Sequence, residues 1–137
     1  MKIRRLGFVA LSVAIAGLLA GCTGSDSYEL FDRPATTKDE LPALFGEEFD
    51  EYADFASRFS ASHDGVDYYV LRDEDALPGA MLYCVAVAAE KPLIACSGSE
   101  GVTASGAGVP EVRLVPTDAQ SGEGWIAISE NLLVRER

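Results

Sequence analysis

A series of short segments rich in β-forming residues, from Arg58 to Arg135, constrains the fold more than any other feature of the chain. Runs of about four to eight such residues, bounded by Gly, Pro, Asp and Asn, predict strands joined by turns. His63-Asp64-Gly65 contains Asp-Gly, a strong signal for a tight hairpin. The spacing predicts an antiparallel meander. Its strands are expected at residues 58–62, 66–72, 81–88, 93–97, 102–105, 111–115, 125–129 and 132–135.

Residues 38–56, ahead of these strands, have the pattern of an amphipathic helix. Thr37 and Glu40 have the spacing of a capping box at its start. At about 100° per residue the apolar side chains fall on one side and most acidic side chains on the other. The apolar set is Leu41, Leu44, Phe45, Phe49, Tyr52 and Phe55. The acidic set is Asp39, Glu40, Glu47, Asp50, Glu51 and Asp54.

Two residues in that segment disfavour a continuous helix. Pro42 belongs in a first turn, and Gly46 costs about 1 kcal/mol relative to Ala, so the segment forms either one helix or two. An apolar stripe of this kind is typical of a helix laid on a sheet, and an exposed partner-binding helix is the rarer interpretation. We therefore predict an α+β fold, a small antiparallel β-meander sheet with one N-terminal amphipathic helix packed on it.

The first 25 residues differ sharply from the rest of the chain. Lys2, Arg4 and Arg5 precede residues 6–21, which carry no charge and are mostly apolar. This is the arrangement of a secretory signal. A spanning helix needs about 20 apolar residues, so an uncleaved anchor is the alternative. The small and polar residues 21–25 disfavour it.

The apolar stretch ends in Leu19-Ala20-Gly21-Cys22, which resembles the lipobox of bacterial lipoproteins. The resemblance implies that the Cys22 thiol receives a diacylglyceryl group and that a signal peptidase cuts before Cys22. Membrane lipid would then hold the chain at the extracytoplasmic face of the cell membrane, because two or more acyl chains anchor stably. An ordinary buried cysteine after a secretory signal is the alternative.

The expected organisation is a signal peptide at residues 1–21, a lipidated Cys22 with a tether over residues 22–36, and a single domain over residues 37–137. Tyr28, Leu30 and Phe31 are apolar enough for this tether to pack on the domain. Cleavage removes three of the 11 basic residues and none of the 22 acidic ones, which leaves a formal net charge of −14. Nucleic acid needs a basic surface, so we expect no nucleic-acid partner.

Lipidation of Cys22 leaves Cys84 and Cys96 as a pair in an oxidising compartment. We predict a disulfide between them, across neighbouring antiparallel strands. Counting inward, Val85 faces Ala95, Ala86 faces Ile94 and Val87 faces Leu93, which leaves a hairpin loop of ordinary length at residues 88–92. Residues 81–88 are apolar on both faces, so their strand is expected to be central and covered on each side.

No set of residues predicts catalysis or a metal site. A Ser-His-Asp triad needs a base beside its nucleophile, and the single histidine, His63, adjoins a turn. Cys84 and Cys96 lack the Cys-x-x-Cys spacing, and two cysteines with one histidine are too few for structural zinc. The acidic groups cluster on a helix face and a loop tip, which are normally solvated. We therefore expect a protein that is not an enzyme and has no cofactor.

The mature part, with its His-Asp-Gly hairpin, its two-cysteine hairpin and its Ile128–Val134 ending, resembles small lipoproteins of actinobacteria that have no assigned activity. The resemblance implies location and size, and no mechanism. Trp125 is interpreted as a ring that seals one end of the sheet, or as an exposed ring that stacks on sugars or peptides. The leading hypothesis is a non-catalytic module that binds an envelope protein or cell-wall component. A small envelope enzyme or an enzyme inhibitor is the alternative.

Overall fold

Strands form at all eight predicted positions in the computed structural model, which describes residues 28–76, 81–97, 102–106 and 108–137. The predicted bounds of β2, β4 and β8 are confirmed residue for residue, and the others shift at their ends. The strands are β1 (Ala56–His63), β2 (Val66–Arg72), β3 (Tyr83–Ala88), β4 (Leu93–Ser97), β5 (Thr103–Gly106), β6 (Val109–Leu114), β7 (Trp125–Ala127) and β8 (Leu132–Arg135). The predicted signal peptide and Cys22 lie outside the described residues.

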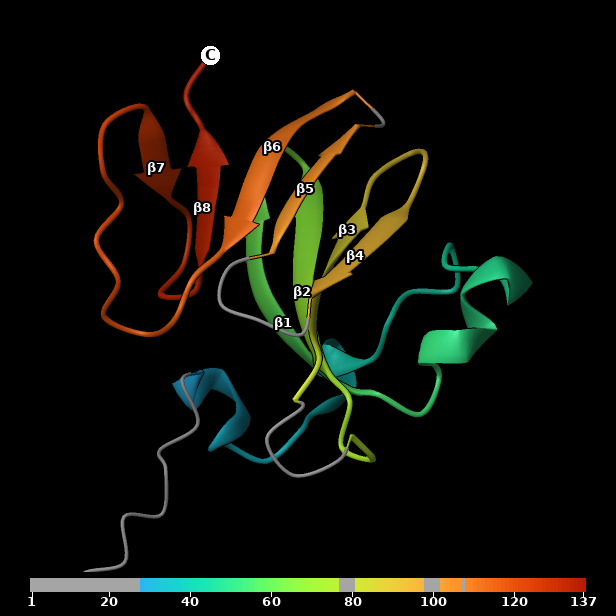
Figure 1. The fold of residues 1–137 in the computed structure, drawn as a ribbon. Helices are drawn as coiled ribbons and strands as arrows, with labels where there is room; N and C mark the ends of the chain where they lie inside the picture. Colours follow the sequence, from blue (N-terminus) through green and yellow to red (C-terminus); the bar gives the residue numbers. More distant parts are fainter. Residues whose placement is uncertain (1–27, 77–80, 98–101, 107) are drawn as a thin grey trace, which may run out of the picture.

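The strands form two antiparallel sheets, so the prediction of an α+β fold with a single meander sheet is wrong. Sheet A has the order β1-β2-β3-β4, and sheet B has the order β5-β6-β8-β7. The second sheet is therefore not a simple meander, because β8 inserts between β6 and β7. In Figure 1, sheet B lies against one side of sheet A, with β7 at the end of sheet B beyond β8.

The predicted helix over residues 38–56 does not form, and no helix of seven or more residues occurs in the described part of the chain. Two short 3-10 turns, η2 (Thr37–Asp39) and η3 (Glu47–Tyr52), occur there instead, and a third, η1 (Glu29–Phe31), precedes the segment. Pro42 and Gly46 account for the break. Pro42 closes a turn by accepting a hydrogen bond from the N–H of Phe45, and Gly46 adopts an extended conformation immediately before η3.

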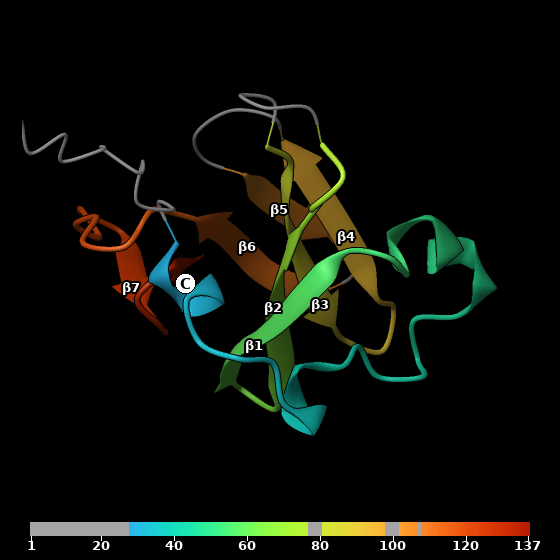
Figure 2. The same ribbon diagram turned by 90° about the horizontal axis from the view of Figure 1, so that it is seen from below.

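The apolar stripe of that segment nevertheless packs on sheet A, as expected of it. Its contacts are to the face that carries Tyr69 and Cys84, and they come from Leu41, Phe45, Tyr52 and Phe55. Leu44 remains 45% exposed, because only a regular helix would turn it toward the sheet. Figures 1 and 2 show this segment and sheet B on different sides of sheet A.

The main core lies between the two sheets. Tyr68, Val70, Val85 and Val87 from sheet A are buried in it. Sheet B contributes the alternating set Ala104, Val112, Leu114, Leu132 and Val134. Residues 84–87 of β3 are fully buried on both faces, which confirms the prediction that this strand is central.

The N-terminal turn η1 is also part of this core. Tyr28 and Phe31, which were assigned to the tether, are only 4% and 7% exposed. Their rings lie 4.4 and 6.2 Å, between centroids, from the ring of Tyr83. The expectation that apolar residues of the tether pack on the domain is confirmed for these two side chains.

Candidate functional site

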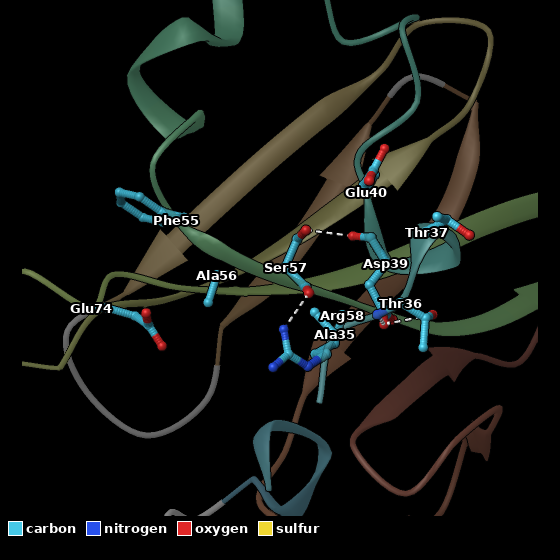
Figure 3. Close-up of a pocket in the computed structure, with 10 residues that line it drawn as sticks. All are labelled: Ala35, Thr36, Thr37, Asp39, Glu40, Phe55, Ala56, Ser57, Arg58 and Glu74. Atoms are coloured by element: carbon cyan, nitrogen blue, oxygen red, sulfur yellow. Dashed lines mark hydrogen bonds between the residues drawn. The ribbon is translucent and has the colours of Figure 1, made fainter. Parts of the chain in front are cut away.

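An open pocket of about 690 Å3 lies where the N-terminal segment crosses β1 (Figure 3). Several polar side chains line the pocket. Thr36 lies just before η2, Thr37 and Asp39 lie within it, Glu40 follows it, Ser57 and Arg58 come from β1, and Glu74 comes from the turn after β2.

Asp39 is the most constrained of these groups and is only 2% exposed. Its carboxylate accepts two hydrogen bonds from Arg33, at 2.7 and 2.6 Å, and one from the N–H of Phe59 at 2.8 Å. The N–H and hydroxyl of Thr36 donate to it at 2.7 and 3.0 Å. Hydrogen bonding from Arg33 holds the pKa of Asp39 well below its usual range, despite the opposing effect of burial. Asp39 is therefore a fixed anion, and it is not on the solvated side where the sequence placed it.

Arg58 is buried near Asp39 and joins β1 to the N-terminal segment. Its guanidinium donates to the carbonyl groups of Ser57, at 2.8 Å, and of Arg33, at 3.1 Å. The guanidinium carbon lies 5.3 Å from the ring centroid of Phe31. The hydroxyl of Ser57 donates to the carbonyl of Asp39. Asp39, Ser57 and Arg58 thus tie residues 33–39 to β1, which is a structural role.

A second cluster lies on the face of sheet B that points away from sheet A. We call Arg113, Trp125 and Arg135 the Trp125 patch. The guanidinium carbons of Arg113 and Arg135 lie 4.2 and 5.2 Å from the centroid of the Trp125 ring. Two cations are therefore gathered around one aromatic ring, an arrangement stabilised by attraction to its π-electrons.

The strand order of sheet B builds this patch. Trp125 on β7 pairs with Arg135 on β8, whereas Arg113 on β6 pairs with Leu133 on β8. Opposed residues share a face, and Leu133 and Arg135 are two residues apart on β8 and also share a face. The side chains of both pairs are therefore on one side of the sheet. The Trp125 ring therefore reaches across β8 toward β6, above Leu133, which is only 2% exposed.

Neither arginine of the Trp125 patch forms an ion pair within the described part of the chain, although Glu111 lies two residues before Arg113 on the same face of β6. No described carboxylate lies within 4.0 Å of the guanidinium of Arg113 or Arg135, in contrast to Arg33 and Arg72, which pair with Asp39 and Glu74 at 2.6 Å. Planar guanidinium groups match carboxylate and phosphate geometry. The patch can therefore bind an anionic group beside an aromatic surface.

The disulfide between Cys84 and Cys96 is present, with a Cα–Cα distance of 4.0 Å. The register around it, with Val85 opposite Ala95 and Val87 opposite Leu93, confirms the predicted hairpin. His63 lies beside the predicted Asp64-Gly65 turn, 3.5 Å from the carboxylate of Asp64, and does not line the pocket.

Arg113 and Arg135 are the residues of the patch that sequence reasoning missed. Arg113 lies between the buried Val112 and Leu114, which places it on the face away from the core. Arg135, in contrast, follows three consecutive buried residues and has no such alternating pattern. Their proximity to Trp125 depends on β8 lying between β6 and β7, and no local pattern indicates that order.

Over the described ranges, no group of three or more His, Cys, Asp or Glu side chains is arranged to hold a metal ion. The helical turns of the same ranges are also too short to cross a membrane. Comparison with family models, with curated protein sequences and with solved structures finds no match for this chain.

Proposed function

We propose that this chain is a lipid-anchored, non-catalytic binding module at the extracytoplasmic face of the cell membrane. The Trp125 patch would contact an envelope protein or cell-wall component. The observation that carries the proposal is the pair of guanidinium groups, 4.2 and 5.2 Å from one aromatic ring, that form no ion pair with a described carboxylate.

The composition of the patch supports a binding role. Trp and Arg are the residue types that most often dominate binding energy at protein interfaces. Basic residues are also scarce in this chain, which has 11 against 22 acidic ones. Two of these basic residues, Arg113 and Arg135, nevertheless contact the same Trp125 ring. Ion pairs with acidic residues would have stabilised the folded state more, and the described part of the chain does not form them here. A pair of arginines outside any ion pair is what a surface for an anionic partner requires.

The anchor rests on Leu19-Ala20-Gly21-Cys22 and the apolar stretch before it. Replacement of Cys22 by Ala should give a protein that no longer partitions into the detergent phase, because the thiol is the acceptor of the lipid. A Cys22→Ala variant that partitions and migrates like the wild type would contradict the anchor and leave the binding proposal standing.

Binding is tested with the lipidated protein, purified in mild detergent from the membranes of the organism that encodes it. We expect chemically cross-linked components to be retained by the wild type and lost with Trp125→Ala. Leu44→Ala is the matched control, because Leu44 is a large apolar residue, 45% exposed, in the segment that packs on the face of sheet A opposite the main core. Equal retention by Trp125→Ala and Leu44→Ala would reject the patch as the binding surface.

A further inference from the structure

The outer edge of sheet B, formed by β7, is open for hydrogen bonding. The N–H of Glu136 donates to the carbonyl of Gly124 at 3.0 Å, and the N–H of Ile128 donates to the carbonyl of Leu132 at 2.9 Å. Antiparallel pairing alternates, so Gly124, Ile126 and Ile128 direct their main-chain groups toward β8. Trp125 and Ala127 therefore direct two N–H and two carbonyl groups away from it.

These four groups are not used by the rest of the described chain, since no hydrogen bond within it reaches the main chain of Trp125 or Ala127. The side chains that flank them alternate in character. The outward face presents the Trp125 patch, and the other face presents Ile126, which is 42% exposed. Ala127 is exposed and small, so it does not block the approach of another strand.

We propose that β7 binds an extended acidic peptide, which adds to sheet B as a further antiparallel strand. This inference rests on the proposed binding function of the Trp125 patch and names its partner. Main-chain hydrogen bonds to Trp125 and Ala127 would supply affinity, and alternate side chains would supply specificity. Acidic residues of the peptide would lie on the face of Arg113 and Arg135, and apolar residues would lie on the face of Ile126.

Charge favours an acidic peptide over a second copy of this chain. In antiparallel pairing of two β7 edges, Arg135 of each copy, on β8, would lie on the same sheet face as Arg135 of the other copy, which adds electrostatic repulsion. An acidic strand instead places carboxylates on that face, directly beside β7. A peptide is also favoured over an acidic glycan, because a glycan has no main chain that could pair with these four groups in strand register.

The test is a titration followed by the emission of Trp125, the single tryptophan of the chain. The probe is a capped eight-residue peptide of alternating Glu and Val. We expect a saturable change of emission, and no change with the matched Lys-Val peptide. Arg135→Gln should weaken binding about tenfold, whereas Arg137→Gln, an exposed arginine outside the patch, should leave it within about twofold of the wild type.

Two further measurements test the main-chain bonds. Residues opposite Trp125 and Ala127 would share their face, so the Glu amides of the bound peptide would point at β7. N-methylation of these Glu amides should abolish binding, whereas N-methylation of the Val amides should preserve it. On the protein side, Ala127→Pro removes one outward N–H while sparing the bonds to β8, and should abolish binding with a normal thermal melt.

Three outcomes would overturn the strand proposal. One is no response to the Glu-Val peptide at millimolar concentration. A second is equal binding of the two N-methylated peptides. The third is binding of oligogalacturonate, an acidic glycan, that survives Ala127→Pro in the absence of peptide binding. The third result leaves the Trp125 patch as a binding surface, so it is distinct from failure of the proposed function, which the Trp125→Ala cross-linking experiment detects.

Discussion

The two edge strands β1 and β7 differ in whether their outward main-chain groups have hydrogen-bond partners. At β1, the buried carboxylate of Asp39 accepts the N–H of Phe59 at 2.8 Å, and the pairing with β2 is interrupted by an irregularity between Phe59 and Ala61. At β7, the main-chain groups of Trp125 and Ala127 have no partner within the described residues. The first edge cannot accept another strand at Phe59, and the second can.

This difference supports the proposal that the β7 edge, and not the β1 edge, contacts a partner. Proteins usually block edge strands with charges, bulges or covering segments, because a bare edge pairs with other chains. Here the carboxylate that blocks β1 is held in place by Arg33, and residues 33–39 cover the edge (Figure 3). The β7 edge, in contrast, lies next to Arg135 on β8, with Arg113 one strand further in, and neither arginine forms an ion pair within the described residues. Changes at β1 should therefore affect stability, and changes at β7 should affect binding.

Removal of the Asp39 carboxylate should have the largest effect on stability. Asp39→Ala leaves the exposed Arg33 without its partner and leaves the N–H groups of Thr36 and Phe59 without their acceptor. We expect a loss of about 4 kcal/mol in the free energy of unfolding, because several hydrogen bonds to one buried charge are lost together. Urea unfolding measures this loss. Asp50→Ala, at an exposed acidic residue, should cost less than about 0.5 kcal/mol, and equal costs for the two variants would contradict the role of Asp39 at β1.

The other edge of sheet A, at β4, is tied to β3 by the disulfide between Cys84 and Cys96. The double variant Cys84→Ala, Cys96→Ala should lose about 3 kcal/mol, mainly because the unfolded chain gains freedom. The variant should still bind the Glu-Val peptide, since β7 belongs to the other sheet. Thermal melts of the wild type with and without reductant provide the control. Identical melts would show that the bridge contributes nothing.

The stabilising effect of Asp39 should depend on pH in a defined direction. The Arg33 guanidinium lowers the pKa of Asp39 in the folded state, so the folded state binds fewer protons than the unfolded state. Its contribution is complete above the unfolded pKa of about 3.9 and is lost as the pH falls toward the folded pKa. Unfolding experiments from pH 7 to pH 2 should show the wild type losing stability more steeply than Asp39→Asn in the acidic range. Parallel curves would refute this linkage.

The smallest effect on stability is expected in the Trp125 patch. Arg113→Gln removes one cation–π contact, which is worth about 1 kcal/mol at a partly buried position. The emission of Trp125 should nevertheless change, because a charge 4.2 Å from the ring centroid is lost. Arg137→Gln should leave the emission unaltered. A large loss of stability from Arg113→Gln would show that the patch is structural.

The sequence was a good guide to strands and a poor guide to how they assemble. Alternation and turn residues located β2, β4 and β8 to the residue, and the cysteine spacing predicted the register of β3 with β4. Those signals are local. The division into two sheets and the position of β8 between β6 and β7 depend on which faces bury each other, and a meander pattern does not encode that choice.

Residues 38–56 and the Trp125 patch illustrate the same limit. The apolar period of residues 38–56 correctly indicated a face packed on a sheet, but Pro42 and Gly46 prevented the helix that the period suggested. Asp39 matched the solvated side of that helix and is instead the buried anion at β1. Trp125 was singled out, whereas its partnership with Arg113 emerged only from the strand order.

Native-state hydrogen exchange tests the contrast between the two edges most directly. The amide of Phe59, bonded to Asp39, and that of Ile126, directed toward β8, should exchange slowly. The amides of Trp125 and Ala127 should exchange within about tenfold of the rate of a free peptide, so that protection alternates along β7. Protection of Trp125 and Ala127 as strong as that of Phe59 would show that the β7 edge is covered, and would contradict the account.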